Sequence, residues 1–295
     1  MKIKTIIIIV IIVLSLSFLF VFFVKSSESE SQVKKSLHDL PKKESSIDPN
    51  SQEYVDRSEE NDINPLENEI FKTDDIVFID GELVEHNYYS LLYSEAHEQA
   101  YWVKYLLSKD MLDNPVVKRK DNFRSDPNVS TGSAELVDYV GSGFDRGHLC
   151  PAKDMESSPV GMSESFFMSN MSPQHPSLNR GRWKQLESHV RKWAIERDSL
   201  IIYCGGVMDS IIDYIGPNEV AVPKYYYKTI YSIKKGRGIA FIMPNKKCTS
   251  SLKQYAVSID SVEKLTHIDF YDEYSLESQE EFESEITLGS WGLDN

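Results

Sequence analysis

Two short segments hold most of the residues in this sequence that could do chemistry. The first, 141–155, contains Asp145-Arg146-Gly147-His148, and the second, 170–187, includes Asn179 and Glu187. The imidazole of His148 can act as a base. The amide oxygen of Asn179 is a hard ligand that suits Mg²⁺, and an arginine such as Arg146 can bind phosphate. This combination is typical of metal-assisted hydrolysis of a phosphodiester.

Each of these residues also has a simpler structural interpretation. A lone histidine such as His148 is more often structural than catalytic, and Arg146 could be an ordinary surface charge. Asn179 could cap a helix, because a helical pattern follows it. A catalytic interpretation is favoured because the second segment follows the first closely and supplies complementary groups.

The two segments predict a strand–strand–helix unit. We expect a strand over residues 144–150, a second extended run over 166–170, and an amphipathic helix over 179–195. Apolar residues recur along that helix at Trp183, Leu186, Val190 and Trp193/Ala194. Asn179 opens the helix, and Glu187 follows it at about 12 Å along the axis. We therefore expect Glu187 to hold metal-bound water rather than the metal itself.

Three motifs in this order resemble the DNA/RNA non-specific endonucleases, which include endonuclease G. They are Asp-Arg-Gly-His at 145–148, Asn-Met-Ser-Pro-Gln at 170–174 and Leu-Asn-Arg-Gly-x-Trp-x-x-Leu-Glu at 178–187, and the resemblance spans roughly residues 80–290. It implies an α+β fold, with a largely antiparallel sheet flanked by helices and a ββα-metal (His-Me finger) catalytic unit. It further implies one Mg²⁺, Mn²⁺ or other divalent cation, DNA and RNA as substrates, and a homodimer as a candidate assembly.

The resemblance also assigns roles. His148 is the general base and Arg146 binds phosphate, while Asn179 holds the metal and Glu187 supports it. The positions similar to the family's substrate-binding residues are Arg124, Asn170, Gln174 and Arg191. Glu187 and Arg191 could instead form an i,i+4 ion pair, and Asn170-Met171-Ser172 matches a glycosylation acceptor only by coincidence.

His148 with an ordinary pKa near about 6.5 would already be a useful base at neutral pH. It would remove a proton from water, so a ribose 2′ hydroxyl is not required, and both DNA and RNA should be cut. The runner-up function is a cell-surface nucleic-acid-binding protein with little or no catalytic activity. The presence of His148, Asn179 and Glu187 together favours the enzyme.

The cysteines and glycines suggest no competing chemistry. The three cysteines have no Cys-x-x-Cys spacing, so a structural zinc site is not expected. Cys150 would share a strand face with His148, and a nucleophilic Cys–His pair is conceivable, but we favour a buried small residue. Gly205-Gly206 follows an apolar run and is predicted to form a turn that ends a strand.

The amino terminus predicts export of the domain. Lys2 and Lys4 precede an apolar stretch over residues 5–24, which is long enough to span a membrane. It is predicted to be a signal anchor or a signal peptide, which leaves the domain membrane-anchored or secreted, outside the cytoplasm. Residues 25–75 are polar and acidic, with the composition of a flexible linker. Residues 76–295 are then the endonuclease domain.

The net charge of −14 is unfavourable for binding nucleic acid. Much of it lies in the linker and beyond Asp260, whereas basic residues gather at 118–124 and 180–192. A local basic surface can bind phosphate on a negative protein. In the later part of the domain we expect strands at 200–204, 220–222, 225–233, 239–243 and 255–259, with a hairpin turn at 234–238 and a helix around Ser261.

Overall fold

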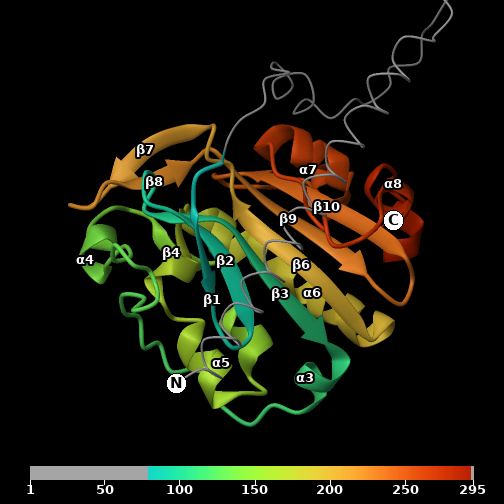
Figure 1. Cartoon of the computed structure of the whole chain (residues 1–295), viewed down its shortest axis with the longest axis horizontal. Coiled ribbons are helices and arrows are strands. Elements are labelled where there is room, and N and C mark those ends of the chain that lie inside the picture. Colours follow the sequence, from blue (N-terminus) through green and yellow to red (C-terminus); the bar gives the residue numbers. More distant parts are fainter. Residues whose placement is uncertain (1–78, 294–295) are drawn as a thin grey trace, which may run out of the picture. The chain divides into compact units, whose positions relative to one another are not determined.

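The computed structural model describes residues 79–293 and has an α+β architecture around a seven-stranded sheet (Figure 1). Each pair of neighbouring strands is antiparallel. In spatial order the strands are β1 (Glu82–Glu85), β2 (Tyr89–Ser94), β3 (Gln99–Ser108), β6 (Ser199–Gly206), β9 (Tyr225–Ser232), β10 (Arg237–Pro244) and β11 (Ala256–Val257). The predicted fold class is confirmed.

Strand β9 lies in the middle of the sheet and is buried on both faces. All eight of its residues are buried, and β6 and β10 pair with it on either side. Successive side chains point to opposite faces, so Ile230 belongs to one core cluster and Tyr231 to the other. Its aromatic and β-branched composition suits such a strand. The strands predicted at 200–204, 225–233 and 239–243 and the turn between the last two are confirmed.

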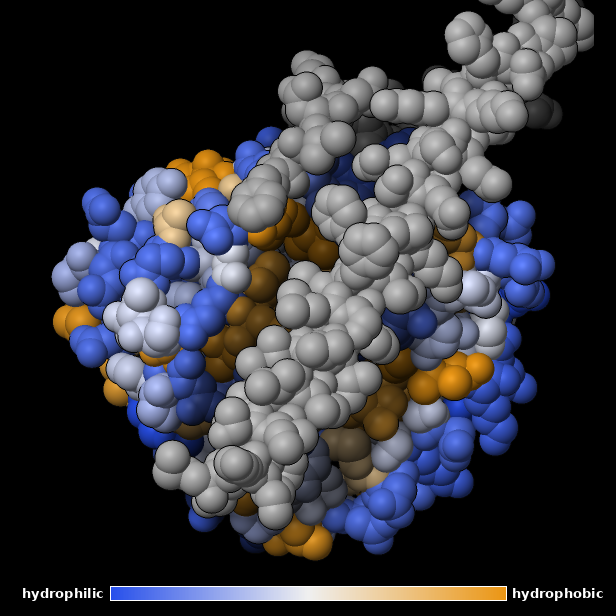
Figure 2. Space-filling model, in the orientation of Figure 1, coloured by the Kyte–Doolittle hydropathy of each residue, from blue (hydrophilic) through white to orange (hydrophobic). Residues whose placement is uncertain are grey.

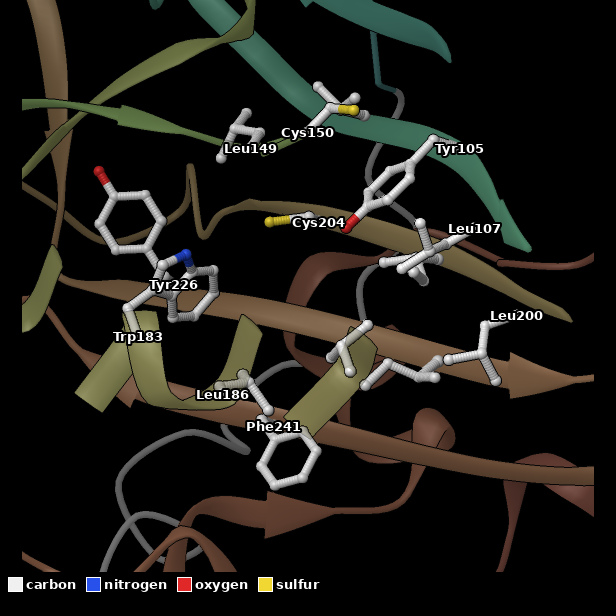
Figure 3. Close-up of a cluster of buried hydrophobic side chains, with 14 of the residues drawn as sticks. Tyr105, Leu107, Leu149, Cys150, Trp183, Leu186, Leu200, Cys204, Tyr226 and Phe241 are labelled. Carbon is white, nitrogen blue, oxygen red and sulfur yellow. The ribbon is translucent and has the colours of Figure 1, made fainter. Parts of the chain in front are cut away.

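Helices cover both faces of the sheet. Helix α6 (Lys184–Arg197) buries Leu186 and Val190 in the cluster that contains Ile230, and Figure 3 shows Leu186 in that core. Helices α7 (Ile259–Thr266) and α8 (Leu276–Glu283) pack into the cluster of Tyr231. The shorter helices are α3 (Lys109–Asp113), α4 (Leu136–Tyr139) and α5 (Pro159–Glu164).

Two small antiparallel ribbons stand apart from the large sheet. Strand β7 (Ile211–Ile215) pairs with β8 (Val220–Pro223), which agrees with the strand predicted at 220–222. Strand β4 (Asp145–His148) pairs with β5 (Met171–Gln174), and His148 lies opposite Met171. The β4–β5 ribbon and α6 together form the predicted strand–strand–helix unit.

Several predicted boundaries are wrong. Residues 168–170 form a 3₁₀ turn, and the second strand of the ribbon begins only at Met171. Strand β11 has two residues, because a 3₁₀ turn occupies 252–255. Gly205 lies inside β6 rather than in a turn, and a Cβ there would be 2.1 Å from the carbonyl oxygen of Tyr101. Glycine is therefore needed at this position for close strand contact.

The helix of the catalytic unit also begins later than predicted. Residues 178–183 form a wide turn with non-helical backbone at Gly181, and α6 starts at Lys184. Within residues 79–293, no helix combines the length and apolarity needed to cross a membrane. The predicted anchor at 5–24 and linker at 25–75 lie outside the described residues.

Candidate active site

A cleft of about 490 Å³ brings together most of the predicted site residues. It lies where the end of β4, the turn 178–183 and the first turns of α6 meet. Five of the eight predicted residues line it, namely Arg146, His148, Asn179, Glu187 and Arg191. The cleft is also strongly basic, because Arg119, Lys153, Arg180 and Lys184 contribute to its wall. Such a surface suits a phosphate backbone.

His148 ends β4 with its ring between two phenylalanines. The ring centroid lies 5.1 Å from that of Phe166 and 5.7 Å from that of Phe123. Its Nε2 atom is buried and has no hydrogen-bond partner among the described residues. Burial, then the nearby Arg119 and Arg146, lower the pKa of His148 to about 3, although Asp121 opposes them. The assumption of an ordinary pKa was therefore wrong, and at neutral pH the imidazole is neutral and can accept a proton.

Asn179 is held by hydrogen bonds that fix the direction of its amide. Its Nδ2 donates to Oδ2 of Asp145 at 2.9 Å, and Arg180 donates to both oxygens of the same carboxylate. Burial acts to raise the pKa of Asp145, but the bonds from Arg180 and Asn179 outweigh it and lower the pKa. With its nitrogen engaged, Asn179 keeps its amide oxygen for another ligand. The helix-cap interpretation is wrong, because α6 begins at Lys184 and the side chain of Asn179 caps no helix.

Glu187 lies beside a group of buried charges. Arg191 donates to Asp154 at 2.8 Å, so the alternative i,i+4 pair with Glu187 is replaced by this contact. Lys228, from β9, is fully buried, and its Nζ lies 5.4 Å from the ring centroid of Trp183. Burial raises the pKa of Glu187 to about 7, with Asp154 adding to the effect, while Lys228, Arg191 and Arg119 act to lower it.

The oxygen donors in the cleft fit a divalent metal ion. Asn179 offers an amide oxygen and Glu187 a carboxylate, which are the ligand types that Mg²⁺ and Mn²⁺ prefer. Asn179 can offer its amide oxygen while it keeps its hydrogen bond to Asp145. Glu187 can offer its carboxylate from its present place in α6. The three free cysteines, Cys150, Cys204 and Cys248, are all buried, so thiolate ligation does not compete.

Comparison with known proteins identifies the family. The sequence pattern of the DNA/RNA non-specific endonucleases matches residues 66–276. The chain belongs to this family. A nuclease of Nostoc sp. is 30% identical over 223 residues, which cover 70% of this chain and 79% of that protein. The mouse mitochondrial nuclease EXOG is 31% identical over 202 residues, covering 62% of this chain but only 55% of the mouse protein.

A solved structure agrees with the family assignment. The crystal structure of an EndoG/EndoGI complex, which concerns the mechanism of EndoG inhibition, superposes with a TM-score of 0.61 at 25% identity. The match covers 67% of this chain and 88% of that chain. The chain is therefore a hydrolase of the DNA/RNA non-specific endonuclease family with an EndoG-like fold.

Three predicted substrate residues of this endonuclease do not line the cleft. Asn170 is fully buried. Its Oδ1 accepts from the backbone N–H of Cys150, and its Nδ2 donates to the carbonyl oxygen of the same residue. Gln174 is fully buried against Gly147. Arg124 donates to Ser163 and lies 4.0 Å above the ring of Phe167. In this structure all three side chains contact the framework of the site.

Arg119 is the site residue that the sequence did not single out. It lines the cleft together with Arg146, and its guanidinium lies 5.0 Å from the ring centroid of Phe166. It also lines a second cavity of about 590 Å³, which shares Arg146, Asn179 and Arg180 with the first. The basic run at 118–120 was the available signal, but nothing in that run distinguishes Arg119 from its neighbours.

Cys150 is a buried core residue, as we predicted from the sequence in preference to a nucleophile paired with His148. It is fully buried, and Figure 3 shows it in the core with Tyr105 and Cys204. Burial, together with Asp154, raises the pKa of its thiol well above the usual value. A thiolate nucleophile paired with His148 does not fit this environment.

Proposed function

We propose that this endonuclease hydrolyses phosphodiester bonds of both DNA and RNA, with water as the nucleophile and one divalent cation. The supporting observation is that His148 and Asn179 line one basic cleft. A base and a hard metal ligand would thus lie beside the same phosphate once substrate enters the cleft. Two mitochondrial proteins that it resembles bear the names nuclease EXOG and endonuclease G, which agrees with a nuclease activity.

His148 acts as the general base in this proposal. The imidazole, which lines the cleft, accepts the proton of the attacking water. Burial, together with Arg119 and Arg146, lowers the pKa of the imidazole and keeps it neutral in the free protein. A bound phosphodiester places negative charge beside these arginines and offsets their effect, so His148 becomes a stronger base when substrate is present. The base is therefore most effective with substrate in the cleft.

The arginines and the metal ligands stabilise the phosphoryl group. Arg146 and Arg119 bind its oxygens through charge-assisted hydrogen bonds. Asn179 provides the amide oxygen that holds the cation, and Glu187 holds water bound to that cation. When bound, the cation neutralises charge that develops on the phosphoryl and leaving oxygens. No step uses the 2′ hydroxyl of ribose, so the sugar type does not restrict the substrate.

The decisive test is to incubate the full chain with plasmid DNA and with RNA, in Mg²⁺ or in excess chelator. We expect both nucleic acids to be cut, and only when the metal is present. Undiminished cutting in chelator would refute the role of the cation. Cutting of RNA alone would refute water as the nucleophile, and binding without cutting would favour the alternative of a nucleic-acid-binding protein.

We also propose that residues 5–24 carry the domain out of the cytoplasm, as an anchor or a cleaved signal. The support is the length of the apolar stretch and the two lysines before it. External protease added to intact cells, or to spheroplasts where an outer membrane is present, should digest the domain. If digestion requires cell lysis, the domain is cytoplasmic.

A further inference from the structure

Three carboxyl groups meet between α7 and α8, far from the residues of the cleft. They belong to Asp260 and Glu263 on α7 and to Glu283 at the end of α8. One oxygen from each lies within 4.8 Å of the other two. These helices pack on the face of the sheet opposite to α6, so this cluster shares no residue with the nuclease site.

Glu283 is the residue that distinguishes this cluster from ordinary surface acids. It is only 4% exposed, and its Oε1 is buried without a hydrogen-bond partner among the described residues. A buried charged oxygen without a partner is unfavourable, so such a group either takes up a proton or pairs with a cation. Glu263 is better satisfied, because the backbone N–H of Phe270 donates to its Oε1 at 2.8 Å.

The charges around the cluster do not compensate Glu283. Burial raises the pKa of Glu283 to about 8, and Glu263, Asp260, Asp269 and Glu280 add to this effect. The pKa of Glu263 is likewise raised to about 7 by burial and by Asp269 and Asp260. Burial and Glu280 raise the pKa of Asp260, and Lys264 opposes them only in part. Burial raises the pKa of Tyr271, and Glu283 and Glu263 add to this effect.

The packing around α8 is rigid enough to hold these carboxyls in place. A Cβ at Gly238 of β10 would lie 2.3 Å from the carbonyl oxygen of Phe282, so helix and strand are in close contact. Phe282 stacks on Tyr231 of β9 with ring centroids 4.0 Å apart. Hydrophilic residues gather near α8 at the right-hand margin of the molecule (Figures 1 and 2). Asp260 and Glu263 are half-buried, so the cluster is in contact with solvent through these two residues.

We propose that Asp260, Glu263 and Glu283 form a second cation site, which binds Ca²⁺ and fastens α8 to α7. All the available ligands are carboxylate oxygens, which select hard cations over zinc or copper. Three carboxylates that converge from two helices give an irregular set. Ca²⁺ accepts such a set at 2.3–2.6 Å, whereas Mg²⁺ requires nearly octahedral geometry. The site is independent of the nuclease reaction, and its role is structural.

The experiment compares Ca²⁺ binding by three forms of the full chain, purified in a non-ionic detergent and stripped of metal. They are the unaltered chain, Glu283→Gln, and Asn179→Ala as the matched control that removes the ligand proposed for the catalytic cation. Calorimetric titration with Ca²⁺ at pH 7.5 measures affinity, and thermal melting measures stability. Asn179→Ala should retain binding and a rise in Tm of about 3–5 °C at tenfold excess over Kd. Glu283→Gln should lose at least tenfold in affinity and most of the rise.

Four results would overturn the proposal. One is an Asn179→Ala protein that neither binds Ca²⁺ nor melts higher with it, which would mean that the three carboxyls share protons instead of a cation. Another is an equal rise in Tm for Glu283→Gln. If Glu283→Gln does not fold, the half-buried Asp260→Asn replaces it, and retention of full affinity there counts against the site. An equal response to Mg²⁺ at equal concentration would reject the selection of Ca²⁺.

Discussion

Two groups of buried carboxyls in this protein differ in whether the fold provides positive charge beside them. Next to the cleft, fully buried Asp154 and half-buried Glu187 lie among the cations Arg191 and Lys228. Between α7 and α8, fully buried Glu283 lies with half-buried carboxyls and among further acids. In both groups burial raises the pKa of the carboxyls.

The difference lies in where the compensating positive charge comes from. At the cleft the chain itself supplies it, through the ion pair between Arg191 and Asp154 and through the buried Lys228. At the α7–α8 cluster a proton or a solvent cation must supply it. The first group is therefore compensated within the fold, whereas the second depends on protons and ions taken from solvent.

Substitutions in the cleft should lower the rate of cleavage more than any other change, and substitutions in the α7–α8 cluster should leave that rate unaltered. His148→Ala removes the general base, so turnover should fall by about 10²–10⁴-fold. Asn179→Ala should instead weaken metal binding, and a higher Mg²⁺ concentration should restore part of its activity. Added imidazole should help only His148→Ala. Plasmid cleavage rates, with circular dichroism to verify folding, provide the measurement.

Glu283→Gln is the matched control for that comparison, because its carboxyl lies outside the cleft. Its rate in Mg²⁺ at 25 °C should equal that of the unaltered chain. A folded His148→Ala protein that cuts DNA at the parental rate would overturn the catalytic proposal. A Glu283→Gln protein that loses as much activity as His148→Ala would mean that the two groups of acids are not separate.

Replacing Lys228 should show that the first group depends on its internal cation. Lys228→Met leaves Glu187 and Asp154 with less compensation, and breaking a buried charge group of this kind costs roughly 3–5 kcal/mol of stability. Lys228 acts to lower the pKa of Glu187, so its loss should raise that pKa further. Denaturant unfolding measures the stability. The exposed Lys235→Met is the control, and a change as small as the control's would mean that Lys228 carries no electrostatic role.

Much of the fold was predictable because its signals are local. The apolar and aromatic run of β9 and the turn after it indicate a buried strand and a hairpin from composition alone. His148 and Asn179 lie in short motifs whose order resembles a known family, so their meeting in one cleft could also be expected. Local signals of this kind are the most reliable part of sequence interpretation.

The remaining features depend on contacts between distant residues. The start of α6 moves to Lys184 because the preceding turn is bound to Asp145 through Arg180. Arg124 resembles a substrate residue in sequence, yet contacts with Ser163 draw it away from the cleft. Burial of Lys228 and convergence of Glu283 on α7 likewise follow from the packing of whole elements. No window of sequence contains these contacts.

The acid limb of the pH–rate profile should identify which group in the cleft titrates. Glu187 has a pKa of about 7, whereas that of His148 is about 3. If Glu187 acts as a carboxylate, protonation below about pH 7 should lower the rate by about tenfold per pH unit. Glu187→Gln should lose the limb along with most activity. Lys228→Met, if folded, should move it to higher pH. A limb near pH 5 that is unchanged in both variants would assign it to another group.

The smallest effect should be the pH dependence of stability contributed by the α7–α8 cluster. The pKa of Glu283 rises from 4.5 in the unfolded chain to about 8 in the folded chain. Between these values the folded state holds a proton that the unfolded state has lost, so the free energy of unfolding decreases as pH rises. The protonated group contributes its full stability below about pH 4.5, and that contribution is lost as pH rises through about 8.

Glu283→Gln carries no titratable proton at this position, so its stability should decline less between pH 5 and pH 8.5. At pH 8.5, without Ca²⁺, we expect Glu283→Gln to melt about 2–4 °C above the unaltered chain, which is the shift that 1 kcal/mol produces in a domain of this size. Added Ca²⁺ should reverse the order, because only the unaltered chain keeps the complete carboxylate set. Parallel melting curves for the two proteins at every pH would show that Glu283 is already compensated within the fold. The contrast between the two groups of acids would then disappear.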